Sequence, residues 1–165
     1  MEKITEIKYN LACGKDYREG YINVDNGSMF TSKVDIDADL NEFSISREEA
    51  DTILVSHFVM YLTPQNAITL FERWNFGLKK GGQLILEMQD LKKLAKTILE
   101  SKEASEINNQ VVQFYGAGAT RGHVWTWCEE TLTPLLKYSG FTNIERFEGG
   151  LKNRLDRDFT LIATK

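Results

Sequence analysis

The chain has 165 residues, a formal net charge of −4, 27% charged residues and 42% hydrophobic residues. These values are ordinary for a globular protein, and the length suits one domain. No long cluster of Lys and Arg is present, so the composition argues against a nucleic-acid partner. No apolar stretch approaches the roughly 20 residues of a membrane span. The N-terminus has no apolar signal core, and Cys13 and Cys128 form no CxxC motif, so we expect a cytoplasmic protein.

Short apolar runs predict four strands in the first third of the chain, at residues 7–11, 21–24, 34–36 and 52–55. A helix is expected over residues 63–82. Thr63 can cap it, Pro64 takes its first position, and the sequence Lys79-Lys80-Gly81 closes it.

The remaining two thirds continue the alternation of strands and helices. We expect a polar, glycine-containing segment at 105–123 without regular structure. The other predicted elements are strands at 84–88, 141–148 and 157–164 and helices at 90–104 and 129–140.

Alternating strands and helices predict an α/β fold, with a mostly parallel sheet and helices on both faces. No helix separates the last two strands, so we expect them to pair antiparallel. Only six residues lie between Gly14 and Tyr21, whereas a parallel crossover usually takes a dozen or more. A tight turn or a single helical turn therefore replaces the first helix.

The first predicted strand ends in "LACG", a turn of small residues. In open α/β sheets, ligands bind outside the carboxyl ends of the strands. Ala12 and Gly14 would let a ligand approach the backbone, and Asp25, which follows the second strand, could accept hydrogen bonds from both hydroxyls of a ribose. The G-x-G-x-x-G fingerprint is missing, and the acid follows Gly14 by 11 residues instead of the ~20 of a dinucleotide site. A nucleoside without phosphates is the better prediction.

An ordered set of motifs extends this pattern over almost the whole chain. They read "YNLACG", "GYINVD", "DIDADLNEF", "ADTILVSHFVMYL", "LKKGGQLILEMQDL", "FYGAGATRGHVWTW" and "EETLTPLLKYSGF". With these motifs, the chain resembles the class I S-adenosylmethionine-dependent methyltransferases. More narrowly, it resembles the small methyltransferase-domain proteins found with polysaccharide and envelope biosynthesis genes. The resemblance implies a Rossmann-like three-layer sandwich with a seven-stranded sheet that ends in an antiparallel hairpin.

The resemblance also implies contacts with S-adenosylmethionine. Ala12, Cys13 and Gly14 would contact its methionine part and ribose through their backbone, and Asp25 would bind the ribose hydroxyls. Asp39 would accept from the adenine amino group, with the Leu40 amide near the ring. The remaining cofactor contacts would come from Asn10 and Ser56.

Two histidines are candidate catalytic residues, because an unperturbed imidazole titrates near neutrality. His57 follows the fourth strand and would lie near the sulfonium, as a base or as a residue that orients a loop. His123, in "RGHVWTW", could be catalytic, bind substrate or anchor the loop. Met60 and Tyr61 stand where the resembling proteins have "EH", so no carboxylate base is predicted there. The acids of "DIDAD" suggest a solvated loop, and we predict no metal site.

We therefore expect one methyltransferase domain over residues 1–165, with a substrate-covering insertion at about 89–127. The acceptor would be a small molecule or a saccharide. It is possibly anionic, because Lys152, Arg154 and Arg157 give the last loop a basic tip. Two alternatives stay open: a catalytically silent cofactor-binding or partner-binding protein, and a nucleotide- or NAD-dependent enzyme. The sequence predicts no oligomeric state.

Overall fold

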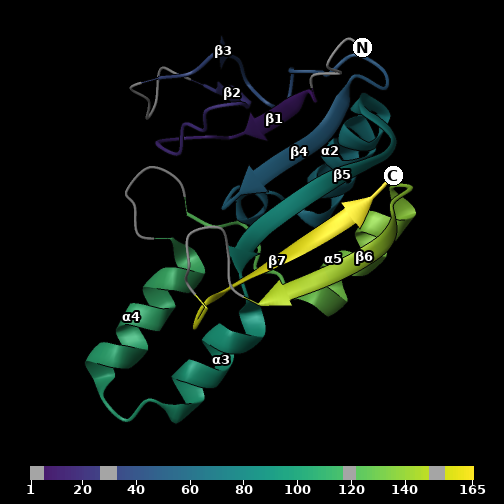
Figure 1. Ribbon diagram of the computed structural model, residues 1–165. Helices are drawn as coiled ribbons and strands as arrows, with labels where there is room; N and C mark the ends of the chain where they lie inside the picture. Colours follow the sequence, from purple (N-terminus) through teal and green to yellow (C-terminus); the bar gives the residue numbers. More distant parts are fainter. Residues whose placement is uncertain (1–5, 27–32, 117–121, 149–154) are drawn as a thin grey trace.

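The computed structural model describes residues 6–26, 33–116, 122–148 and 155–165 (Figure 1). They form a seven-stranded sheet with the strand order β3-β2-β1-β4-β5-β7-β6. The strands are β1 (Lys8–Leu11), β2 (Ile22–Asp25), β3 (Ile36–Asp37), β4 (Ala50–Ser56), β5 (Leu78–Gln89), β6 (Thr142–Glu148) and β7 (Asp158–Thr164).

The pairing of the strands confirms the predicted sheet. The first five strands pair in parallel, and β7 pairs antiparallel with both β5 and β6. Because β7 runs against β5, its first residue, Asp158, lies opposite Gln89, the last residue of β5. The start of β7 therefore shares an edge with the carboxyl ends of the parallel strands.

The helix before β5 ends earlier than predicted. Helix α2 spans Pro64–Gly77, and the Thr63 side chain accepts from the Asn66 amide as its N-cap. The predicted closing lysines belong instead to β5, where Leu78 pairs with Ala50 and Lys79 forms an ion pair with Asp51. The C-terminal end of the predicted helix is wrong because sheet pairing outweighs the local signal of basic residues and glycine.

Two helices pack against each other on one face of the sheet (Figure 1). They are α2 and α5 (Glu129–Tyr138). Trp74 and Phe71 of α2 and Leu132 and Leu136 of α5 are buried in the same core as the central strands. The hydrophobic core therefore lies between these two helices and the sheet.

Two further helices, α3 (Leu91–Glu100) and α4 (Ala104–Tyr115), pack on each other beyond the carboxyl end of β5 (Figure 1). The sequence predicted one longer helix and then an irregular segment. Instead, α3 stops at Glu100, and α4 occupies much of that segment. Leu94 is the one buried residue of α3, and α4 has none. Neither helix forms the second helical layer expected of a three-layer sandwich.

The connection from β1 to β2 consists of turns, as predicted, and buried side chains brace it. The Asn10 amide group donates to the backbone oxygen of Asp16 and to Asn23 Oδ1. Asn23 in turn donates to the backbone oxygens of Arg18 and Tyr21. These bonds satisfy backbone groups that a helix would otherwise satisfy, so a short connection suffices.

Among the described residues, no helix is both long enough and apolar enough to span a membrane.

Candidate functional site

The predicted cofactor residues converge at the carboxyl edge of the sheet. A pocket of about 70 Å³ lies where β1, β2 and β3 end and where β4 leads into the short helix η1 (Val59–Tyr61). Its lining is Ala12, Asp25, Asn26, Ala38, Asp39, Leu40, Asn41 and Phe58. Four of the eight predicted cofactor-binding residues therefore line one pocket, although they come from three separate segments.

The turn after β1 has an unusual backbone conformation. Ala12 and Gly14 both have φ of +53°. This left-handed region costs an alanine about 1–2 kcal/mol, whereas glycine adopts it freely. The buried Cys13 lies between them and donates its backbone N–H to the Val24 oxygen at 3.2 Å. Burial raises the pKa of the Cys13 thiol to about 11, so this thiol is neutral at pH 7.

Asp25 is held in a fixed orientation at the end of β2. Its Oδ2 accepts from the Gly14 N–H at 2.7 Å, and its Oδ1 accepts from the Asn26 N–H at 2.7 Å. An ionised carboxylate can accept about four hydrogen bonds. Counting donors from the described residues, each oxygen accepts one hydrogen bond and can accept another, so the two oxygens could bind the two hydroxyls of a vicinal diol.

Asp39, Asn41 and Phe58 also line the pocket. Asp39 Oδ1 accepts from the backbone and the side chain of Asn41, both at 2.9 Å. Among the described residues, no donor reaches Asp39 Oδ2. The pocket thus combines an aromatic side chain with a carboxylate oxygen that can accept from an amino group.

Asn10 lies beneath this pocket and does not line it. It is 1% exposed, and its amide group donates to the Asp16 backbone oxygen and to Asn23 Oδ1.

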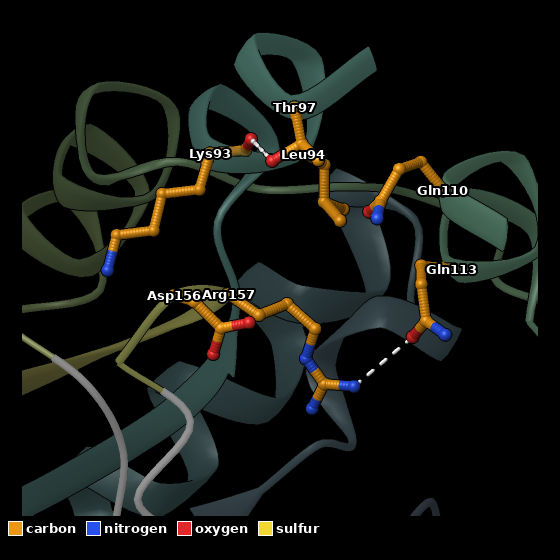
Figure 2. A pocket seen from close by; sticks show the side chains of 7 residues that line it. All are labelled: Lys93, Leu94, Thr97, Gln110, Gln113, Asp156 and Arg157. Atoms are coloured by element: carbon orange, nitrogen blue, oxygen red, sulfur yellow. Dashed lines mark hydrogen bonds between the residues drawn. The ribbon is translucent and has the colours of Figure 1, made fainter. Parts of the chain in front are cut away.

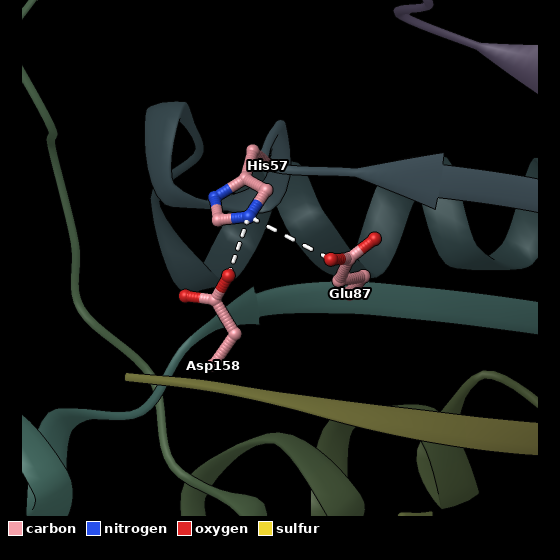
Figure 3. Close-up of side chains that lie close together, drawn as sticks. All are labelled: His57, Glu87 and Asp158. Carbon is pink, nitrogen blue, oxygen red and sulfur yellow. Dashed lines mark hydrogen bonds and ion pairs between the residues drawn. The ribbon is translucent and has the colours of Figure 1, made fainter. Parts of the chain in front are cut away.

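Ser56 and His57 leave β4 beside two buried carboxylates, Glu87 and Asp158 (Figure 3). His57 Nε2 is 3.0 Å from Asp158 Oδ2 and 3.9 Å from Glu87 Oε1. The Ser56 hydroxyl donates to Glu87 Oε2 at 3.0 Å. The ligand atoms of His57, Glu87 and Asp158 lie within 4.8 Å of one another, a spacing that also suits a metal ion.

Arg157 compensates the charge of Asp158. Its Nε donates to Asp158 Oδ1 at 2.6 Å and its Nη2 to Oδ2 at 3.0 Å. Burial alone would raise the pKa of Asp158, but the hydrogen bonds from His57 and Arg157 outweigh it and lower the pKa to about 2. A guanidinium on both oxygens opposes a second cation at this carboxylate, so the cluster is better described as an ion-pair network than as a metal centre.

His123 belongs to the segment that crosses η1. Its backbone N–H donates to the Tyr115 oxygen at 2.9 Å, and its ring meets Tyr61 edge-on at 5.3 Å between centroids. Burial is the largest effect on the pKa of His123 and lowers it, although hydrogen bonds with the backbone of Gln113 and Phe114 act in the opposite direction. The structure therefore brings both predicted catalytic histidines to one region.

Two tryptophans anchor and border this segment. Trp127 is buried and donates from Nε1 to the Val59 oxygen at 3.0 Å, whereas Trp125 is 45% exposed. Trp127 therefore packs into the interior, and Trp125 stays partly open to solvent.

A second pocket, of about 380 Å³, opens between α3, α4 and the residues before β7 (Figure 2). Its lining is Lys93, Leu94, Thr97, Gln110, Gln113, Asp156 and Arg157. Both cations are already engaged, since Lys93 pairs with Glu148 and Arg157 pairs with Asp158. Of the predicted basic tip, Lys152 and Arg154 lie outside the described residues.

Sequence reasoning missed Glu87, Asp158 and Phe58. Glu87 gave a signal, because an acid stands inside the apolar run "LILEM". Asp158 gave none, since only the antiparallel register of β7 carries it to His57.

The strand order, the antiparallel hairpin and the pocket at the strand ends together define the Rossmann-like fold of S-adenosylmethionine-dependent methyltransferases. A methyltransferase of this kind from Archaeoglobus fulgidus superposes with a TM-score of 0.65 at 17% identity, over 99% of this chain and 87% of that one. A possible exported protein from Bordetella parapertussis superposes with a TM-score of 0.62 at 16% identity, over 96% of this chain and 61% of that one.

A third similar structure is phosphoethanolamine N-methyltransferase 2 from Haemonchus contortus, in complex with S-adenosyl-L-methionine. It superposes with a TM-score of 0.62 at 12% identity. The match spans all of this chain and 50% of that protein. No protein-family model matches the sequence, and no curated protein matches it. At these identities the likeness shows the fold alone.

Proposed function

We propose that this protein binds S-adenosylmethionine and transfers its methyl group to a small-molecule or saccharide acceptor. The observation that carries the proposal is the pocket in which Ala12, Asp25, Asp39 and Leu40 meet at the carboxyl edge of the sheet. The fold supports it, because several solved structures with this fold are S-adenosylmethionine-dependent methyltransferases.

The residues present fit the cofactor. With one donor on each oxygen in the part of the chain that the structure describes, the Asp25 carboxylate could also accept from the ribose hydroxyls. Asp39 Oδ2 would accept from the adenine amino group, and Phe58 would contact the ring. The pocket is smaller than the 300–1,000 Å³ of typical ligand sites. The rest of the cofactor would therefore extend along the turn at Ala12–Gly14 toward Ser56 and His57.

When bound, the cofactor supplies an electrophilic methyl group on a positively charged sulfur. The protein aligns the acceptor with that group. Acceptor hydroxyls and amines must lose a proton, so a nearby base helps the transfer. We assign this role to His57 or His123. The resemblance to proteins of polysaccharide biosynthesis supports a saccharide acceptor. Because Arg157 is paired, any anion binding would depend on Lys152 and Arg154.

Calorimetry with S-adenosylmethionine on the wild-type protein and on Asp25→Ala tests the proposal. The variant loses two charge-assisted hydrogen bonds to the ribose, each contributing roughly 1.5–3 kcal/mol, so affinity should fall at least ~10-fold. Glu42→Ala removes an exposed carboxylate close to the pocket in sequence and should bind like the wild type. Equal affinity of folded Asp25→Ala would rule out this site.

Two further measurements separate the alternatives. NAD should not bind, because the pyrophosphate fingerprint is absent. Labelled cofactor with a panel of acceptors should show transfer. If the cofactor binds and no label moves to any acceptor, the silent binding protein becomes the better description.

A further inference from the structure

We propose that Asp158 is a positioning residue, which holds His57 with a proton on Nε2 and thereby makes Nδ1 the atom that accepts the proton of the methyl acceptor. This inference rests on the proposed function, and it selects one base and one nitrogen atom.

The hydrogen bonding of Asp158 determines which nitrogen is protonated. Arg157 donates to both carboxylate oxygens, so the carboxylate is ionised and can only accept. His57 Nε2, 3.0 Å away, must then be the donor. A neutral imidazole carries one N–H, which leaves Nδ1 as the unprotonated nitrogen.

The backbone of His57 is also held in place. His57 has φ of +53°, a conformation that non-glycine residues rarely adopt. Its N–H donates to the backbone oxygen of Glu87 at 2.8 Å. The side chain is 20% exposed, and Figure 3 shows its second nitrogen facing away from both carboxylates. The free nitrogen therefore points out of the cluster.

The cluster can also take up the charge that the transfer creates. As the acceptor oxygen or nitrogen bonds to the methyl carbon, the carbon–sulfur bond breaks, its electron pair stays on sulfur, and the acceptor proton passes to Nδ1. His57 then carries one positive charge, with Glu87 Oε1 at 3.9 Å and Asp158 at 3.0 Å. Both carboxylates therefore lie close enough to stabilise the imidazolium electrostatically.

His123 is less suited to this role. Burial lowers its pKa, and a charge on His57 disfavours a second charge beside it. No described carboxylate forms an ion pair with its ring.

The first test is the tautomer of His57 in the wild-type protein, read from the nitrogen-15 shifts of its ring at a pH where the ring is neutral. The chain has two histidines, so His123→Gln assigns the signals. We expect Nε2 to be protonated and Nδ1 to be unprotonated. The opposite tautomer, or an equal mixture of the two, would overturn the inference. This result does not depend on cofactor binding or turnover.

The second test is Asp158→Asn. The asparagine side chain has one oxygen, which accepts from Arg157. Its NH₂ group then faces His57 and donates to Nε2, so Nε2 must be unprotonated. We expect the His57 proton to move toward Nδ1, while affinity for S-adenosylmethionine stays within about twofold, because Asp158 does not line the cofactor pocket. Unchanged His57 shifts would contradict the inference. Glu145→Gln, an exposed change on the neighbouring strand β6, should leave the shifts as they are.

A metal ion is the rival occupant of this cluster. Addition of Zn²⁺ or Mn²⁺ to the wild-type protein should not perturb His57 selectively. Tight binding of either ion that disappears in His57→Gln would replace the inference with a metal site. If the cofactor fails to bind to the wild-type protein, the proposed function fails while the tautomer result stands.

Discussion

Asp158 is a fully buried carboxylate that depends on two partners from different parts of the chain. Arg157 is its neighbour in sequence, whereas His57 is 101 residues away. An ionised group can be buried only when it is paired and hydrogen-bonded, and these bonds meet that requirement. The same bonds link the stability of the fold to pH.

The pH dependence has a definite sign. An aspartate ordinarily has a pKa of 3.8, and the folded pKa of Asp158 is about 2. The unfolded chain therefore binds this proton more readily. The stabilisation is complete above pH ~4 and is lost as the pH falls toward 2, with about 1 kcal/mol lost by pH 3.

Urea unfolding at pH 5 and pH 3 measures this loss. The stability difference between wild type and Asp158→Asn should shrink by about 1 kcal/mol over this interval. The subtraction cancels the other carboxylates, which are common to both proteins. A difference that stays constant would mean that folding does not lower the pKa of Asp158.

The end of α2 leaves no room for a larger residue at Gly77. A Cβ atom placed on Gly77 would lie 2.8 Å from Ile45 Cβ and 3.0 Å from Ile45 Cγ2. Both Gly77 and Ile45 are buried. The close approach lets the chain pass directly from α2 into β5, where Leu78 already pairs with β4.

Gly77→Ala should therefore destabilise the protein although alanine favours helices. Overpacking costs typically ~1–3 kcal/mol, which exceeds the gain of up to about 1 kcal/mol in helix propensity. Thermal or urea unfolding measures the change. Asn66→Ala, on the exposed side of the same helix, should be nearly neutral. A Gly77→Ala protein as stable as the wild type would show that Ile45 can move away.

At the scale of the whole molecule, α4 is joined to the sheet by polar contacts. The helix has no buried residue. Gln113 Oε1 accepts from Gln89 Nε2 at 3.0 Å and from Arg157 Nη1 at 3.1 Å. Gln89 ends β5 and Arg157 precedes β7, so one side chain of α4 is linked to two strands. The expected substrate-covering segment thus has a weak attachment beside the His57 cluster.

Gln113→Ala should release α4 without unfolding the sheet. Loss of two hydrogen bonds, one of them from a charged donor, corresponds to roughly 2–4 kcal/mol. Amide exchange in α4 should accelerate at least ~10-fold, while exchange in β4 and β5 stays unchanged. Hydrogen-exchange mass spectrometry checks this, with the exposed Asn109→Ala as control. Equal acceleration in sheet and helix would indicate global destabilisation instead.

The sequence by itself determined the strands that end at the cofactor pocket. The apolar runs before Ala12 and Asp25, and the short connection between them, are local patterns. In a parallel sheet such strands end at one edge whatever their neighbours do. Ala12 and Asp25 were expected at this edge from the strand pattern, the family resemblance added Asp39 and Leu40, and all four line one pocket.

Only the tertiary structure decided the His57 cluster and the bounds of the helices. Glu87 and Asp158 meet His57 because β7 pairs antiparallel with β5 in one particular register. A shift of one residue would turn Asp158 to the other face of the sheet, and no local pattern fixes that register. For the same reason α2 ends at Gly77: pairing between β4 and β5 is a long-range interaction, and it outweighs the propensity of the residues that follow.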